Sequence, residues 1–264
     1  MPHRPLRFAT FLAPNLFDVY AFIVRRVGQL LGVPAELFLG VDYAQAEHAD
    51  AAFLCGLAYI ELVDRGCPLE PVAAPVLNGE RYGGRPIYYS DVVVRHDSPF
   101  RCFADLRGRS WSYNEPCSQS GYGITRYRLV ELGETKGFFG RVVEAGWHER
   151  SIRLVCSGEV DATAVDAHVL ALTLRDLPDL AGHLRIIDTL GPSTIQPVVV
   201  SRRLPECLRA AVREVLLGLA ETVADRAQLA RGFVDRFVAV RDASYDDLRH
   251  MRDTCRRANF LTLR

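Results

Sequence analysis

Residues 109–132 have the sequence RSWSYNEPCSQSGYGITRYRLVEL, in which a strand, a polar loop and a helix follow one another. We predict the strand over 109–113 and the helix over 124–132. Between them lies Ser118-Gln119-Ser120-Gly121-Tyr122, which has two hydroxyl side chains and a glycine where the helix begins. This loop is the most informative feature of the chain, because its residue types suit both the start of a helix and the binding of an anion.

Two interpretations of this loop stay open. In the first, Ser118 or Ser120 only caps the helix by accepting hydrogen bonds from its first backbone N–H groups. In the second, those N–H groups, the helix dipole and the serine hydroxyls together form a cradle for an anion. Gly121 would let the backbone approach such a ligand closely. The loop is not a P-loop, because no Gly-Lys-Ser/Thr sequence follows it.

Strands and helices alternate along the rest of the chain, which is typical of an α/β protein. A helix is predicted where apolar residues recur at helical spacing over 18–31, and Gly32 ends it. The loop 55–59 precedes a helix that begins at Ile60, and the valine-rich segment 88–95 is predicted as a strand. From Pro205 onward the chain is mostly helical, and the predicted helices are 208–219, 229–238 and 245–256.

The composition of the chain argues against several classes of protein. The chain has 264 residues, 49% of them hydrophobic, and its 32 basic residues balance its 32 acidic ones. Such a chain can build a core, and it has no overall positive charge to attract nucleic acid. No segment has the roughly 20 apolar residues of a membrane span, so no membrane insertion is expected. No secretory leader is visible, which indicates a cytoplasmic protein, or a periplasmic one whose leader has been removed.

The cysteines give no sign of a metal site. There are seven, and no C-x-x-C or C-x-x-H spacing occurs among them. We expect reduced thiols, no metal and no cofactor.

Other loops contain single candidates for contact with an anion. His148 follows Gly146-Trp147 just before a predicted helix. A histidine there is usually solvated or a capping group, whereas over an anion it would be a donor with a pKa near physiological pH. Tyr59 and Tyr88 lie at the ends of predicted loops, where an aromatic ring more often fills a core.

Several segments occur in a characteristic order along the chain. They are ADAAFLCGLAY (49–59), YYSDVVVRHDSP (88–99), FADLRG (103–108), SQSGY (118–122), AGWH (145–148) and VCSGEVDA (155–162). This series resembles the phosphonate-binding family of ABC-transporter substrate-binding proteins, and the resemblance covers most of residues 7–220. It implies the type II periplasmic-binding-protein fold, with two mixed sheets flanked by helices in two lobes. The implied lobes are 1–90 plus 195–264 and 91–194, joined by crossover strands near Ser90 and Thr194 that act as hinges.

The resemblance also implies a function and a site. The expected function is to bind a small phosphorus oxyanion (phosphate, phosphite or an alkylphosphonate) for an ABC-transporter permease or a sensor kinase. An enzyme on the same fold that acts on a small anionic metabolite, as in menaquinone biosynthesis, is the alternative. The family's oxyanion contacts correspond to residues Tyr59, Tyr88, Ser118, Gln119, Ser120 and His148. Gln119 stands where a small hydroxyl residue is common, so we expect its backbone N–H to be the contact.

Four further residues are possible ligands or supports of the site: Cys117, Asp166, His168 and Gln196. Cys117 lies beside the loop, where a helix start lowers the pKa of a thiol. Asp166 could be a base, although a carboxylate at a strand end more often caps a helix. Family members that bind aminoalkyl phosphonates resemble one another in placing carboxylates opposite the oxyanion. His168 and Gln196 occupy those positions here, so we expect little preference for an amine.

Overall fold

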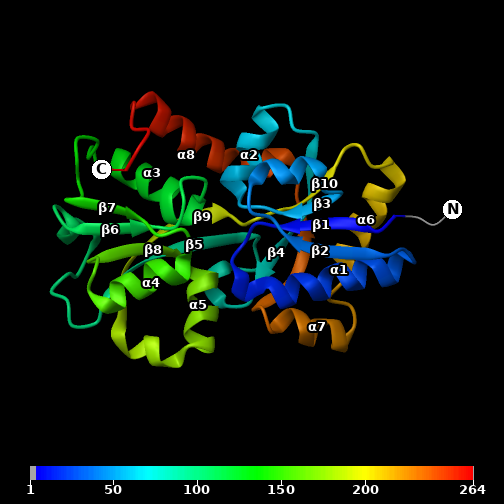
Figure 1. Cartoon of the computed structure of the whole chain (residues 1–264), viewed down its shortest axis with the longest axis horizontal. Coiled ribbons are helices and arrows are strands. Elements are labelled where there is room, and N and C mark those ends of the chain that lie inside the picture. The colour runs from blue at the N-terminus through cyan, green and yellow to red at the C-terminus, as the bar shows by residue number, and fades with distance from the viewer. Residues whose placement is uncertain (1–3, 264) are drawn as a thin grey trace. The chain divides into compact units, whose positions relative to one another are not determined.

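The computed structural model describes residues 4–263. Contacts between residues divide the chain into two compact units. The first unit contains the chain up to Ile87 together with Thr194–Asp246, and the second contains Tyr88–Ser193 together with the residues from Asp247 on. Each unit has its own mixed sheet with helices packed against it (Figure 1), as the sequence predicts. Within residues 4–263, no helix is both long enough and apolar enough to cross a membrane.

The first unit contains a six-stranded sheet in the order β11-β4-β10-β3-β1-β2. Strand β1 (Leu6–Thr10) pairs in parallel with β2 (Ala35–Leu39) and β3 (Ala51–Phe53). Antiparallel pairing then joins β3 to β10, β10 to β4 and β4 to β11. The other strands and the α-helices described in this unit are β4 (Leu69–Leu77), β10 (Val198–Ser201), β11 (Val234–Ala239), α1 (Phe17–Leu31), α2 (Gly56–Asp64), α6 (Glu206–Gly218) and α7 (Val223–Ala230).

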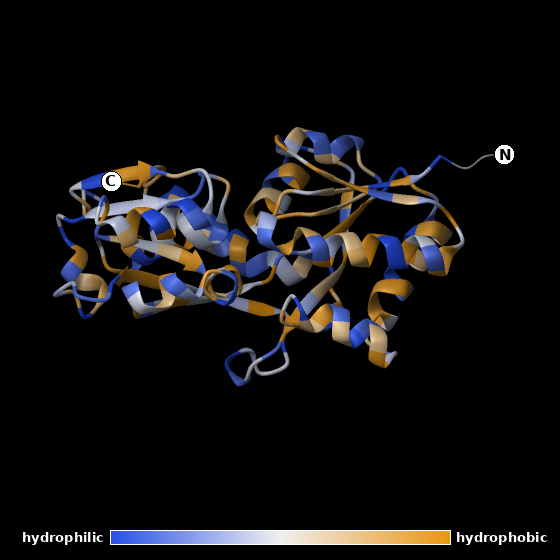
Figure 2. Ribbon diagram, turned by 60° about the horizontal axis from the view of Figure 1, so that its bottom comes forward, coloured by the Kyte–Doolittle hydropathy of each residue, from blue (hydrophilic) through white to orange (hydrophobic). Residues whose placement is uncertain are grey.

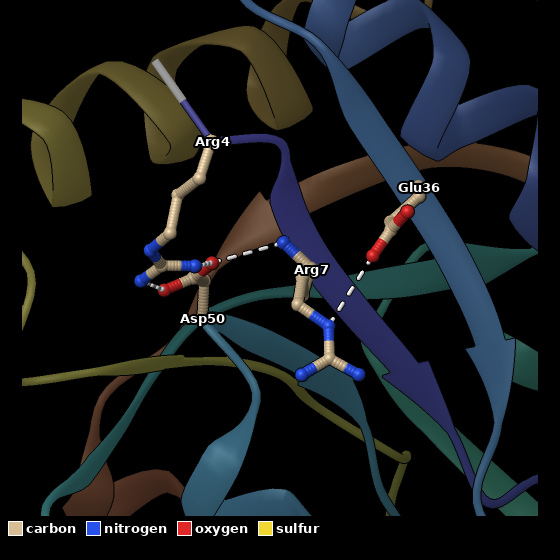
Figure 3. Close-up of polar contacts among 4 residues, drawn as sticks. All are labelled: Arg4, Arg7, Glu36 and Asp50. Carbon is tan, nitrogen blue, oxygen red and sulfur yellow. Dashed lines mark hydrogen bonds and ion pairs between the residues drawn. The ribbon is translucent and has the colours of Figure 1, made fainter. Parts of the chain in front are cut away.

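A buried carboxylate fixes the start of β1 against β3. Asp50 is 5% exposed and accepts two hydrogen bonds from the Arg4 guanidinium, at 2.7 and 2.8 Å, and one from the Arg7 backbone N–H at 2.9 Å (Figure 3). The Asp50 carboxylate raises the pKa of Arg4 through these hydrogen bonds. The side chain of Arg7 bonds Glu36 on the neighbouring strand β2. Polar contacts thus support the parallel pairing at this edge of the sheet.

The second unit contains a five-stranded sheet in the order β7-β6-β8-β5-β9. Strand β6 (Ser110–Tyr113) pairs in parallel with β7 (Arg141–Glu144) and β8 (Ala162–Asp166), while β5 (Ile87–Arg95) pairs antiparallel with β8. Strand β9 (Leu184–Thr194) lies at the edge beside β5. The helices are α3 (Ile124–Glu131), α4 (His148–Ser157), α5 (Ala167–Asp176) and α8 (Asp246–Arg257).

The two faces of this second sheet bury different amounts of apolar surface. Val92 and Val94 of β5 belong to a large cluster around Trp111, whereas Val93 belongs to a small one with Ile152 and Val165. Alternate residues of a strand point to opposite faces, so the valine run supplies both clusters. Figure 2 shows hydrophilic and hydrophobic residues alternating along the helices, as expected when one side of a helix packs on a sheet.

The end of the chain differs from the sequence prediction in two places. Segment 229–238 is not one helix: α7 ends at Ala230, and β11 begins at Val234 after Phe233, whose φ is 53°. Val234 and Phe237 are buried in β11, which pairs with β4 at the sheet edge. The residues after Asp246, predicted in lobe one, group with the second unit, because Phe260 and Leu263 are buried in the cluster around Trp111.

Candidate functional site

The loop after β6 leads into the helix through a π-helical turn. Residues Gln119–Gly123 form a π-helical turn that continues directly into α3. Ser118 is the N-cap, and its Oγ accepts a hydrogen bond from the Gly121 N–H at 3.1 Å. Ser118 therefore caps this turn, as one of the two interpretations predicts. Capping uses one lone pair of the Ser118 oxygen and leaves its O–H group available as a donor, so capping does not exclude anion binding.

Glycine is required at position 121 by a close approach of the backbone. A Cβ atom added there would lie 2.1 Å from Asn114 Oδ1, far inside contact distance. Any larger residue would push the turn away from the end of β6, so the sequence Ser-Gly in this loop determines how tightly the loop packs.

His148 brings a second helix start to the same place. It is the first residue of α4, and its Nε2 lies 3.0 Å from Ser120 Oγ. Ser120 Oγ in turn lies 3.3 Å from Ser118 Oγ. All three side chains are buried, with exposed fractions of 3, 4 and 9% for Ser118, Ser120 and His148. Two hydroxyls and an imidazole thus meet where two helices of the second unit begin.

This cluster carries no fixed charge. Burial lowers the pKa of His148 to about 4, so the imidazole is neutral at pH 7. Within residues 4–263, none of the three side chains contacts a charged group, and Nδ1 of His148 is buried there without a hydrogen-bond partner. The sequence led us to expect an imidazole that titrates near physiological pH; desolvation by the surrounding protein moves it well below that range.

Gln119 directs its side chain to other parts of the second unit. It is 1% exposed, and its amide Nε2 lies 3.2 Å from both Ser193 Oγ and Met251 Sδ. The side chain is therefore engaged inside the protein, and the expected contact of the Gln119 backbone N–H with a ligand remains a prediction.

The two tyrosines are buried and lie in different units. Tyr59 lies within α2, which begins at Gly56 rather than at Ile60, and its hydroxyl donates a 2.6 Å hydrogen bond to Asp242. A direct contact with an anion would require that this bond breaks, and the contact remains a prediction. Tyr88 is 1% exposed and is the first residue of the second unit.

The four residues expected as possible ligands or supports of the site lie in different parts of the structure. Asp166 is the N-cap of α5, where its Oδ1 accepts the His168 N–H at 2.8 Å and the Val169 N–H at 3.4 Å. His168 is 6% exposed within the first turn of that helix, and Cys117 precedes the N-cap Ser118 and is half-buried. Gln196 belongs to the first unit. In the described range 4–263, no three His, Cys, Asp or Glu side chains gather as metal ligands.

Replacing Asp166 by alanine should lower the free energy of unfolding by about 1–2 kcal/mol, because two backbone N–H groups lose their acceptor. Urea unfolding measures this change. Asp176→Ala, at the exposed end of the same helix, is the control and should change stability little. Equal effects of the two substitutions would contradict the capping role.

Sequence reasoning did not find the partners Ser193, Met251 and Asp242. They are 74, 132 and 183 residues from the side chains that they contact. No local pattern marks them, since only the packing of distant segments brings them near.

Two helix starts with buried hydroxyl and imidazole groups between them are chemically suited to hold a small anion. The family model for the phosphonate periplasmic substrate-binding proteins of ABC transporters matches residues 10–245. The chain belongs to this family, which consists of binding proteins rather than enzymes.

Solved structures agree in fold. A binding-protein component of an ABC phosphonate transporter from Pseudomonas aeruginosa is 21% identical, with a TM-score of 0.85, and the match covers 97% of this chain and 88% of that one. PhnD1 from Prochlorococcus marinus, solved with methylphosphonate, is 17% identical with a TM-score of 0.82, covering 96% and 98%. The aliphatic sulphonate-binding protein SsuA from Escherichia coli is 14% identical with a TM-score of 0.64, covering 97% and 88%. These similarities confirm the type II periplasmic-binding-protein fold.

Proposed function

We propose that this protein binds a small phosphorus oxyanion (phosphate, phosphite or an alkylphosphonate) at Ser118, Ser120 and His148. The observation that carries the proposal is the buried cluster of these three side chains at the starts of the π-helical turn and of α4. Both helix starts favour negative charge. The ligand of the Prochlorococcus relative, methylphosphonate, is of this chemical class.

The neutrality of the cluster supports anion binding. A ligand that loses water must recover its hydrogen bonds from the protein, and hydroxyl, imidazole and backbone donors can supply them. None of the contacts of Ser118, Ser120 and His148 in the described residues is with a carboxylate, which would repel an anion.

Isothermal titration calorimetry with phosphate, phosphite and methylphosphonate tests the proposal directly. We expect at least one of them to bind with a dissociation constant below about 10 μM, that is, with about 7 kcal/mol or more. Absence of heat from all three at millimolar ligand would contradict the proposed function.

Binding of the anion should raise the pKa of His148 from about 4 in the free protein, because a nearby negative charge favours the protonated imidazole. Between the free and the bound pKa the complex takes up a proton, so the affinity for an anion of fixed charge falls as pH rises through this window. NMR titration of the imidazole with and without methylphosphonate measures both values. An imidazole with the same pKa in both states would exclude contact with the anion.

Methylphosphonate should outcompete 2-aminoethylphosphonate by at least about tenfold, or 1.4 kcal/mol. A buried ammonium needs a carboxylate partner. The positions at which the family resemblance places such carboxylates are His168 and Gln196, and Asp166 nearby accepts two helix N–H bonds. A competition titration decides the order, and tighter binding of the amine would show that a carboxylate reaches the ligand.

We further propose that the partner is an ABC-transporter permease, or a sensor kinase that reads the liganded form, and that the mature protein acts in the periplasm. Family membership supports these assignments. The expected hinges near Ser90 and Thr194 and the closure of two lobes on the ligand remain predictions.

A further inference from the structure

The side chain of Gln119 connects three segments of the second unit that are distant in sequence. Its Nε2 lies 3.2 Å from Ser193 Oγ at the end of β9 and 3.2 Å from Met251 Sδ in α8. Gln119 is 1% exposed and Ser193 is 2% exposed, so the contact between them is shielded from water. Ser193 is also the last residue of the second unit before the chain passes into the first.

Both hydrogens of this amide nitrogen face acceptors within the protein. A primary amide has two N–H donors, and here one acceptor is a hydroxyl and the other a thioether, which is the weaker acceptor of the two. The flanking residues Ser118 and Ser120 contact each other, and Ser120 also contacts His148. The loop therefore contains two hydroxyls for the anion cluster and, between them, a side chain bonded to the rest of the unit.

We propose that Gln119 is a positioning residue for the oxyanion site: its amide holds the loop to Ser193 of β9, so that Ser118 and Ser120 are in place before the ligand arrives. This inference rests on the proposed function. The physical reason is preorganisation, because a donor that is already fixed loses less conformational entropy when the ligand binds.

The experiment uses the intact protein and a double-mutant cycle. Gln119→Leu replaces the amide by an apolar side chain that is one atom shorter and has no N–H donor, and Ser193→Ala removes only the acceptor oxygen. Calorimetry with methylphosphonate should show a loss of affinity of about tenfold for each variant. The double variant should bind no more weakly than Gln119→Leu alone, because both changes break one contact. Additive losses, or wild-type affinity in Ser193→Ala, would overturn the proposal.

Thr189→Val is the matched control on the same strand. Its hydroxyl donates a 2.8 Å hydrogen bond to Asp91, so the substitution disturbs β9 without touching Gln119. Affinity should stay within about twofold of the wild type. A loss equal to that of Ser193→Ala would assign the effect to general loosening of β9 and overturn the positioning role.

A second readout needs no ligand and separates this inference from the proposed function. NMR of the free protein follows the Gly121 amide, whose N–H donates to Ser118 Oγ, and the His148 ring. Ser193→Ala should shift both signals while Thr189→Val leaves them in place; unchanged signals in Ser193→Ala would overturn the inference. Ser193→Ala decides the matter by itself if Gln119→Leu does not fold. If the wild type binds none of the three anions, the proposed function fails, but these shifts still test the connection.

Discussion

Replacing both Ser118 and Ser120 by alanine is expected to weaken methylphosphonate binding at least about a hundredfold. Each hydrogen bond to a charged ligand contributes roughly 1.5–3 kcal/mol, and every 1.4 kcal/mol is a factor of ten in affinity. Both hydroxyls lie in the buried cluster with His148, where water cannot replace a lost donor. Calorimetry on the wild type and the double variant measures the loss.

Single variants separate binding from stability in this experiment. Ser118 also caps the helix through the Gly121 N–H, so Ser118→Ala should lower the free energy of unfolding by about 1 kcal/mol. Among residues 4–263, the contacts of Ser120 Oγ are with the Ser118 and His148 side chains and not with a helix N–H, so Ser120→Ala should reduce affinity with a smaller change in stability. Ser157→Ala, at the exposed end of α4, is the control. Unchanged affinity in the double variant would place the ligand elsewhere.

Lowering the pH from about 6.5 to 4 should cost the protein about 3 kcal/mol of stability through His148 alone. Burial lowers its pKa to about 4 in the folded protein, while the unfolded chain takes up the proton near the ordinary value of 6.5. In this window the unfolded state binds more protons, so stability falls as pH falls; each unit of pKa difference corresponds to about 1.4 kcal/mol. Above pH 7 the imidazole is neutral in both states, and the effect vanishes.

The measurement compares urea unfolding of the wild type and His148→Gln at pH 7, 5.5 and 4.5. Glutamine does not titrate, so the difference in stability between the two proteins should shift in favour of the variant as the pH falls. His183→Gln replaces an exposed histidine and should keep the pH dependence of the wild type. If His148→Gln also keeps it, the imidazole is not held neutral by burial.

Much of the architecture could be predicted from the sequence, because many helices and strands are marked by the spacing and type of residues that are close in sequence. The apolar spacing before Gly32 predicted α1, and the valine run of 88–95 predicted the strand β5. That both faces of β5 are buried is a finding of the structure. The Ser118 loop was placed correctly between a strand and a helix, since hydroxyl and glycine residues mark helix starts by their own hydrogen bonds. The order of such motifs sufficed to indicate the family.

The edges of the fold were harder to predict. Residues 234–239 have apolar positions compatible with a helix, and only pairing with β4 makes them the strand β11. Likewise, the last residues have no local feature that assigns them to a unit; the burial of Phe260 and Leu263 around Trp111 does so. The secondary structure of such segments depends on which other strand or helix of the chain they pack against.

The sequence by itself determined which residues could contact an anion, because hydroxyl, imidazole and glycine chemistry belongs to the residue types. The tertiary structure alone decided how they act. It buries His148, which lowers the pKa of the imidazole and keeps it neutral. It also places the Tyr59 hydroxyl where it donates to Asp242, and the Gln119 amide where it donates to Ser193. Burial and the distances between side chains far apart in the chain are properties of packing, and they set the pKa and the hydrogen-bond partner of each group.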